Sequence, residues 1–251
     1  MIQLVSYLSD LNRRKRIECA VNILNRATEP FVLFSGSTIL EPTDIYALER
    51  KLKNHNVTAL LEVSHMTSST FINNVNCLFL VHNGKVKNMF SQQLFATSNE
   101  IKNNEDLAER LLLELEQRRK IVINEKKCLI LQCGEINILS NIQSEHNRVV
   151  FRFSNNCSLQ ERFQNLLYET DIILNPMHTP MGNQGKMQKR REYLSACNHY
   201  YFSCSNTKIQ NRHNQNKRAS LQHKLQYAYK NSLPLLSFGC EMTEDYIMQY
   251  F

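Results

Sequence analysis

Several features that define other classes of protein are missing from this chain of 251 residues. No apolar run approaches the roughly 20 residues of a membrane-spanning helix, so we expect no membrane partner. The first eight residues are too short for a secretory signal, and their basic cluster follows rather than precedes them. These absences predict a cytoplasmic protein.

Regular cysteine spacing is also absent. The eight cysteines form no disulfide framework, and a chain of this size does not need one, so we expect reduced thiols that lie mostly in the core. Cys197, His199 and Cys204 are close in sequence, but they lack a paired fourth ligand at the spacing of a zinc finger. We therefore expect no metal site and no cofactor.

Two clusters carry much of the positive charge, at 13–16 and 186–224, and aromatic residues are missing from the second between Thr207 and Lys224. The net charge is +7 and the sequence pI about 9.0, which suggests an anionic partner. Proteins that read nucleic acids usually interleave aromatic side chains with basic ones. We therefore expect a solvated basic surface loop here, and a nucleic-acid partner is unlikely on this ground.

The chain has no internal repeat and no low-complexity linker, and short β-prone runs alternate with helical patterns. Asn83-Gly84 between two such runs indicates a hairpin, so the sheet structure is not purely parallel. The alternation predicts an α/β fold with a single domain over residues 1–251. The predicted strands are 31–34, 57–63, 77–81, 127–131, 149–153, 171–174 and 200–204; the predicted helices are 16–27, 41–54, 105–119, 159–169 and 186–197.

The most informative stretch begins with the β-prone run 127–131 and continues through Cys133, Gly134 and Glu135. A side chain that ends a buried strand, just before a glycine-assisted turn, is presented at the mouth of a sheet. The following backbone N–H groups can then face the atom that it attacks. The pattern predicts a nucleophile at Cys133; the alternative is a buried cysteine that ends a core strand.

The order of these segments resembles that of the nitrilase superfamily, the carbon–nitrogen hydrolases. The resemblance implies a four-layer α-β-β-α sandwich with two mixed β-sheets, and a cysteine-dependent hydrolysis of amides or other carbon–nitrogen bonds. The segments that carry it are 31–37, 56–63, 76–86, 90–95, 129–135, 171–178 and 191–206.

That family uses a Glu-Lys-Cys triad, and only the cysteine has a counterpart in this sequence. The glutamate position reads Ser35-Gly36, and the lysine position reads Gln92-Gln93. The resemblance makes the glutamate a general base and the lysine a stabiliser of the tetrahedral intermediate. Loss of either function typically costs about two to four powers of ten in rate. An active enzyme would therefore need relocated groups.

Glu135 and Glu100 are the candidate relocated carboxylates, so the predicted catalytic set is Cys133, Glu135 and Glu100. The resemblance implies a second, supporting glutamate near Glu100. Glu135 has an alternative role, which is to place a negative charge at the start of the following helix. His178 ends a predicted strand and is a candidate proton-transfer group. Weaker cationic candidates, expected on solvated surfaces, are Lys85, Lys87 and Arg191.

Three functions remain open at this point. The first is a cysteine-dependent hydrolase that acts on a small amide-like substrate. The second is a non-catalytic binding or regulatory module of the same fold, which the missing glutamate and lysine favour. The third is a basic, nucleic-acid-associated protein, which rests on charge alone and would bind with a steep salt dependence. A homodimer is a candidate assembly because members of the resembled family often pair their sandwiches.

Overall fold

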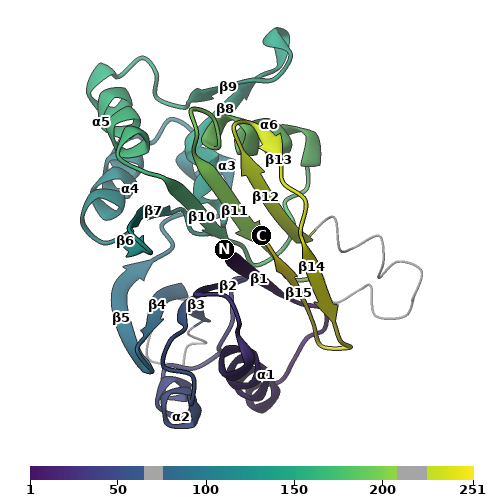
Figure 1. The fold of residues 1–251 in the computed structure, drawn as a ribbon. Coiled ribbons are helices and arrows are strands. Elements are labelled where there is room, and N and C mark those ends of the chain that lie inside the picture. The colour runs from purple at the N-terminus through teal and green to yellow at the C-terminus, as the bar shows by residue number, and fades with distance from the viewer. Residues whose placement is uncertain (65–75, 208–224) are drawn as a thin grey trace.

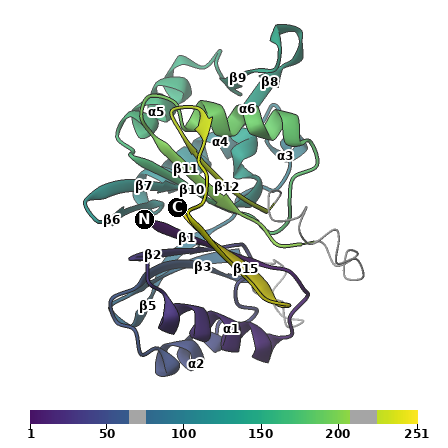
Figure 2. The ribbon, with the colours of Figure 1, turned by 45° about the vertical axis from the view of Figure 1, so that its right-hand side comes forward.

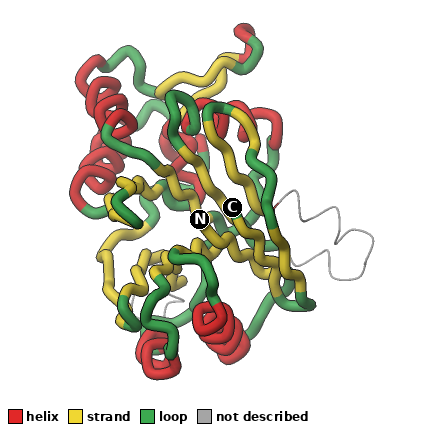
Figure 3. The backbone as a smooth tube through the Cα atoms, in the orientation of Figure 1, coloured by secondary structure: helices red, strands yellow, loops and turns green. Residues whose placement is uncertain are grey.

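The computed structural model describes residues 1–64, 76–207 and 225–251, and these residues form four layers. Two β-sheets pack face to face, and helices cover the outer face of each (Figures 1 and 2). The strands therefore lie between two groups of helices (Figure 3). The predicted α-β-β-α sandwich is confirmed.

The first sheet has seven strands and carries α1 (Arg13–Arg26) and α2 (Asp44–Lys51) on its outer face. Strands β1, β2 and β3 run parallel, whereas the strands at either side of them are antiparallel, so the sheet is mixed. Its order is β14 (Gly239–Met242), β15 (Tyr246–Tyr250), β1 (Ile2–Tyr7), β2 (Phe31–Phe34), β3 (Thr58–Ser64), β4 (Asn76–His82) and β5 (Lys85–Gln92).

The second sheet has six strands, and its parallel centre is β11, β10 and β7. Its order is β13 (Leu233–Pro234), β12 (Gln226–Lys230), β11 (Tyr200–Cys204), β10 (Ile172–Pro176), β7 (Lys126–Ile130) and β6 (Lys120–Ile123). The helices on its outer side are α3 (Ser98–Ile101), α4 (Glu105–Gln117), α5 (Cys157–Tyr168) and α6 (Gln184–Leu194). Between β7 and α5 come the 3₁₀ helices η1 (Cys133–Ile138) and η2 (Gln143–Glu145) and the small hairpin of β8 (Leu139–Ile142) and β9 (Arg148–Phe151).

Side-chain alternation along the strands explains the layering. On β3, Leu60 belongs to the apolar cluster between the sheets, whereas Ala59 and Leu61 belong to the cluster beneath α1 and α2. On β10, Leu174 faces the other sheet, and Ile173 packs with the helices of the second outer layer. Both sheets are thus covered on both faces, as near-continuous apolar strands require.

Every strand and helix predicted above is confirmed as an element of its type, within a few residues at its ends. Asn83 and Gly84 both have positive φ, 53° and 69°, as a type I′ hairpin turn demands. Strand β9 lies in the small hairpin and not in either large sheet. The sequence reading missed β1, although all six of its residues are buried between β15 and β2.

The cysteine prediction was wrong in one respect. Only Cys128 and Cys204 are buried, and the other six cysteines are half-buried or exposed. A cysteine is small enough to lie at a helix end or in a turn, so its hydrophobicity does not by itself place it in the core.

Candidate active site

Three segments converge where the two sheets end. They are the turn after β7, the turn after β10, and the last residues of β3 with the loop that follows β2. The N–H of Leu131 donates to the carbonyl of Leu174 at 2.9 Å, which continues the pairing of β7 and β10 beyond β7. The N–H of Gly36 donates to the carbonyl of Met177 at 2.9 Å, which joins the first sheet to the second. These bonds fix the backbone around Cys133, His178 and Glu62.

Cys133 stands at the first position of η1, separated by two residues from the end of β7, and its φ is +47°. This left-handed conformation costs a non-glycine residue about 1–2 kcal/mol. Strain of this kind clusters at functional sites. A Cβ on Gly134 would lie 1.8 Å from the carbonyl oxygen of Ala96, so only glycine fits at the second position of the turn. The strand–Cys–Gly pattern therefore produces a strained elbow that leaves Cys133 half-buried.

A chain of three side chains begins at the Cys133 sulfur. Its Sγ lies 3.1 Å from His178 Nδ1, and His178 Nε2 lies 2.5 Å from Oε1 of Glu62. Both ring nitrogens of the histidine are therefore occupied, one by the thiol and the other by a carboxylate. This is the order of nucleophile, base and orienting acid that defines a catalytic triad.

The carboxyl group of Glu62 is fully buried, with no exposed side-chain surface. Besides His178, it accepts hydrogen bonds from the N–H of Ser37 at 2.8 Å and from Nε2 of Gln132 at 2.5 Å. Glu62 shares the inward face of β3 with Leu60, which explains why it points between the sheets. Hydrogen bonds on both oxygens fix the carboxylate and thereby orient the imidazole.

Electrostatics favour the imidazolium form of His178. Burial lowers the pKa of this histidine, but the hydrogen bonds and negative charges of Cys133 and Glu62 outweigh that effect and raise the pKa to about 11. A positive charge on the ring lies between two groups that can carry negative charge. The arrangement can therefore hold the proton that the Cys133 thiol gives up.

Gly36 makes room for the histidine ring. A Cβ at this position would lie 2.6 Å from His178 Cδ2, well inside van der Waals contact. Asn206 holds the same loop, because its Nδ2 donates to the Gly36 carbonyl at 2.7 Å and its Oδ1 accepts from the Tyr7 N–H at 2.9 Å. The side chain of Ser35 also bonds to Asn206. The Ser35-Gly36 segment thus positions the ring.

Glu135 occupies a buried ion pair beside the elbow. Its Oε2 lies 2.9 Å from Arg119 Nη1, and neither side chain has exposed surface. The same carboxylate accepts from the N–H groups of Gln132 and Leu94, at 2.8 and 2.9 Å. Arg119 also donates to the carbonyl of Gln92 at 2.8 Å. These contacts tie the elbow to the end of β5.

Glu100 lies at the start of the short helix α3. Its Oε2 accepts from the N–H and hydroxyl of Thr97, at 2.6 and 2.7 Å, and this capping box closes the helix end. The hydroxyl of Thr97 is the main reason that the pKa of Glu100 is lowered. Among the residues that the structure describes, neither Glu100 nor Glu135 is hydrogen-bonded to Cys133 or His178.

The weaker cationic candidates lie elsewhere. Lys85 is exposed and pairs with Glu49 at 3.0 Å, and Lys87 is exposed as expected. The expectation of a solvent-facing Arg191 was wrong, because its side chain is buried and its guanidinium stacks 3.4 Å from the ring centre of Tyr227. An arginine can bury its planar head on an aromatic face, which helical periodicity does not reveal.

Sequence reasoning missed Glu62. One signal was available, since a carboxylate interrupts the otherwise apolar run of β3. Charged residues are almost never fully buried unless they have a partner. The partner, His178, is 116 residues further along the chain, so only the packing of the sheets reveals it.

Residues 1–64, 76–207 and 225–251 contain no group of three or more histidine, cysteine, aspartate or glutamate side chains that could hold a metal ion. Within the same ranges no helix has both the length and the apolarity to cross a membrane. The basic segment 208–224 lies outside the described residues.

Comparisons with known proteins relate this chain to others through structure. No protein-family model matches the sequence, and no curated protein matches it. The NitN amidase from Nesterenkonia sp. AN1 superposes with a TM-score of 0.53 at 8% identity, over 100% of this chain and 92% of the amidase. XC1258 from Xanthomonas campestris is a carbon–nitrogen hydrolase superfamily protein with an arsenic adduct in its active site. It superposes with a TM-score of 0.51 at 8% identity, over 98% of this chain and 88% of XC1258.

A cysteine-to-alanine variant of the Nesterenkonia amidase was solved in complex with butyramide, and it gives a TM-score of 0.53 at 8% identity, over 99% of this chain and 89% of the amidase. Another structure of that amidase shows acrylamide added to its active-site cysteine. The sequence resemblance and these superpositions agree over nearly the whole chain. The chain has the fold of the nitrilase-superfamily amidases.

Proposed function

We propose that this protein is a cysteine-dependent hydrolase of small amides or related carbon–nitrogen bonds. The observation that carries the proposal is the hydrogen-bonded chain from Cys133 through His178 to Glu62. It supplies a nucleophile, a base and an orienting carboxylate on a fold that amidases use. In this proposal His178 and Glu62 take the place of the glutamate and lysine of the Glu-Lys-Cys triad.

The proposed reaction starts from the thiolate–imidazolium pair, in which His178 Nδ1 already holds the proton of the Cys133 thiol. The sulfur then attacks the carbonyl carbon and forms a tetrahedral intermediate. His178 returns the proton to the leaving nitrogen, the carbon–nitrogen bond breaks, and an amine or ammonia departs from a thioester. Water attacks the thioester with His178 as base, which releases a carboxylic acid and restores the thiol.

The start of η1 is the proposed oxyanion site. The N–H of Gly134 directly follows the nucleophile and is the candidate donor, whereas the N–H of Glu135 already donates to the carbonyl of Gln132 at 3.0 Å. Backbone donors at this position can stabilise the charged oxygen of the intermediate without a lysine. Removal of one such donor in other enzymes costs about two to three powers of ten in rate.

Glu135 and Glu100 receive structural roles in this proposal. Glu135 neutralises Arg119 and holds the elbow, and Glu100 caps α3. Their catalytic roles predicted from the sequence remain the competing hypothesis, and the same experiment addresses both.

The experiment measures turnover of butyramide and a panel of small amides, nitriles and carbamoyl compounds. Cys133→Ala is expected to abolish turnover, and His178→Gln and Glu62→Gln are expected to lower it about 10²- to 10⁴-fold. Glu100→Gln serves as the matched control, because it removes the charge of an exposed carboxylate and should leave turnover within about twofold.

Turnover that survives Cys133→Ala refutes the thiol mechanism. A large loss in Glu100→Gln, with Glu62→Gln unaffected, restores the carboxylate predicted from the sequence. If no variant and no wild-type protein turns over any compound, while butyramide still binds, the non-catalytic binding module becomes the better hypothesis.

A further inference from the structure

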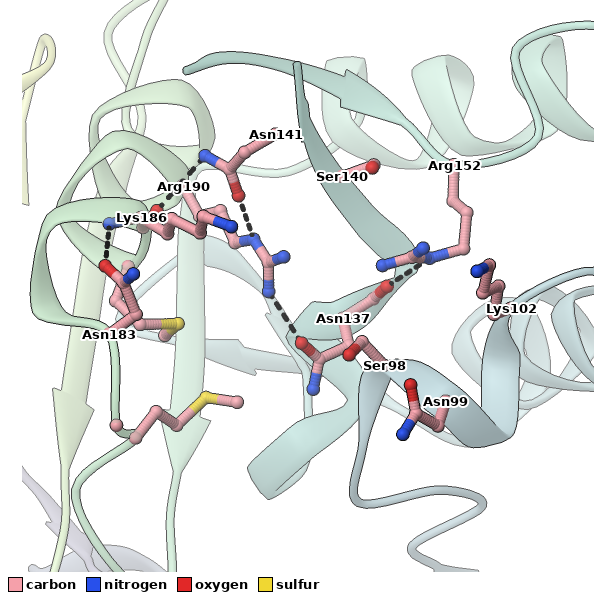
Figure 4. Close-up of a pocket in the computed structure, with 13 residues that line it drawn as sticks. Ser98, Asn99, Lys102, Asn137, Ser140, Asn141, Arg152, Asn183, Lys186 and Arg190 are labelled. Carbon is pink, nitrogen blue, oxygen red and sulfur yellow. Dashed lines mark hydrogen bonds between the residues drawn. The ribbon is translucent and has the colours of Figure 1, made fainter. Parts of the chain in front are cut away.

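A polar pocket lies on the outer side of the six-stranded sheet. It has a volume of about 440 Å³ and is formed by α3, η1, β8 and the start of α6 (Figure 4). Four cationic side chains line it, and no acidic side chain does. They are Lys102, Arg152, Lys186 and Arg190.

The two arginines are fixed by neutral acceptors. Arg190 is only 7% exposed, and it donates to the side-chain oxygens of Asn137 at 2.7 Å and Asn141 at 2.9 Å. Arg152 donates to the backbone carbonyl of Asn137 at 2.8 Å and to that of Leu139 at 3.3 Å. Figure 4 shows the guanidinium groups approaching Asn137 from opposite sides. Both cations are therefore preorganised.

Neither arginine has a counter-ion among the described residues, and the same holds for Lys102 and Lys186. Burial lowers the pKa of Arg190 to about 10, with a further contribution from the nearby charge of Arg152, and burial also lowers the pKa of Arg152. Buried charges are normally paired, because an isolated one loses its hydration. The pocket therefore carries a positive charge that the described residues do not neutralise, which favours an anionic ligand.

We propose that this pocket binds a small phosphate-bearing molecule. Arginine matches the geometry of a phosphate with several directed N–H donors, and four cationic groups suit a dianion better than a single carboxylate. The first turn of α6, an eleven-residue helix, borders the pocket at Asn183 and adds the favourable dipole of a helix start. A volume of about 440 Å³ fits a small metabolite rather than a nucleic-acid duplex.

This pocket is separate from the proposed catalytic chain, although the two are close in the structure. Asn137 Nδ2 donates to the carbonyl of Gly134, the residue after Cys133, at 2.8 Å. None of the cationic side chains is hydrogen-bonded to Cys133 or His178 among the described contacts. The proposal therefore does not depend on amide hydrolysis.

Titration of the purified protein with inorganic phosphate and with pyrophosphate tests the proposal. Ionic strength is held constant with sodium chloride, and binding is followed by calorimetry and by the melting temperature. At ten times its dissociation constant, pyrophosphate is expected to raise the melting temperature by about 3–6 °C.

Two variants remove cations from the pocket. Lys186→Gln changes a side chain that anchors no other residue in the described contacts, and Arg152→Gln removes a guanidinium. Each is expected to weaken pyrophosphate binding at least about tenfold. Lys189→Gln is the matched control, because Lys189 lies on the exposed side of α6 and pairs with Glu192. The affinity of this variant for pyrophosphate should stay within twofold of wild type.

Absence of binding by both phosphate and pyrophosphate overturns the proposal, as does unchanged affinity in folded Lys186→Gln protein. The last measurement is a titration with a single-stranded oligonucleotide. If it binds more tightly than pyrophosphate, and Lys186→Gln weakens it equally, the occupant is a nucleic-acid backbone and the small-molecule assignment is wrong.

Discussion

Replacement of Glu62 by glutamine isolates the charge of the proposed triad. The two side chains have almost the same shape, so the packing between the sheets should survive. The new amide group would face Nε2 of Gln132, but the Oε1 atom of Gln132 is buried and has no partner among the described residues. A rotation of the Gln132 amide lets that oxygen accept the new N–H, although it breaks the hydrogen bond that Gln132 Nε2 donates to the carbonyl of Asn76 at 3.0 Å. We therefore expect a folded protein that has lost one negative charge.

The size of the effect follows from the geometry. Opposite charges about 4 Å apart attract each other by about 4 kcal/mol at an effective dielectric constant of 20. The His178 side chain is 24% exposed, so solvent screens part of this attraction, and we expect about 2–4 kcal/mol. The loss of Glu62 removes a cause of the raised pKa of His178 and destabilises the imidazolium by this amount. The thiolate–imidazolium pair should become about 30- to 1000-fold less populated.

Alkylation of Cys133 by iodoacetamide measures that population without any knowledge of the substrate. The rate is read from the labelled peptide by mass spectrometry at pH 7. An ordinary thiol is still about 3% ionised at this pH, so Glu62→Gln is expected to slow the reaction by about ten- to thirtyfold and no more. Glu100→Gln is the control, and exposed Cys157 provides an internal reference. An alkylation rate in Glu62→Gln within twofold of wild type would refute the triad.

Three further outcomes test other parts of the site. Gly36→Ala should displace the ring of His178, because the Cβ of the new alanine would lie 2.6 Å from that ring. We expect alkylation of Cys133 to slow at least about tenfold, with little change in the melting temperature. An unchanged alkylation rate would contradict the placement of the ring. Glu135→Gln leaves the charge of Arg119 buried and unpaired, so we expect it to lower the free energy of unfolding, measured in urea, by about 3–5 kcal/mol. A loss of turnover without destabilisation would instead support a catalytic role for Glu135. Amide turnover should persist above pH 6.5 and fall only as pH rises toward about 11. The reason is that the raised pKa of His178 keeps this general acid protonated over that range. A decline in turnover near pH 6.5 would show that His178 has the pKa of an ordinary histidine.

Much of the fold could be predicted from local patterns. The Asn83-Gly84 turn and the apolar runs of β2, β3 and β10 carry their signals within a few residues. The C-terminal strands carry weaker signals, since β14, at the edge of its sheet, has only four residues and none of them is buried. That residues 1–251 form a single carbon–nitrogen hydrolase-like domain stays a prediction.

The site was predictable only in part. The Cys133-Gly134 turn has a local signature, because the strained backbone needs glycine next to the thiol. Glu62 and His178 become partners through the stacking of two sheets, which no local pattern encodes. Of the two carboxylates that the sequence favoured, only Glu135 is near Cys133 in sequence. The directions of the Glu135 and Glu100 side chains depend on the helices η1 and α3 that carry them.

The proposed triad bridges the two sheets, because Glu62 belongs to one and Cys133 and His178 follow strands of the other. Neighbouring residues of a strand are about 3.3 Å apart, so a slip of one sheet past the other by a single residue would break the chain of hydrogen bonds. The alkylation rate of Cys133 therefore reports on the alignment of the two sheets. A small truncation between the sheets, such as Leu60→Val, is expected to change the alkylation rate of Cys133 while the protein stays folded.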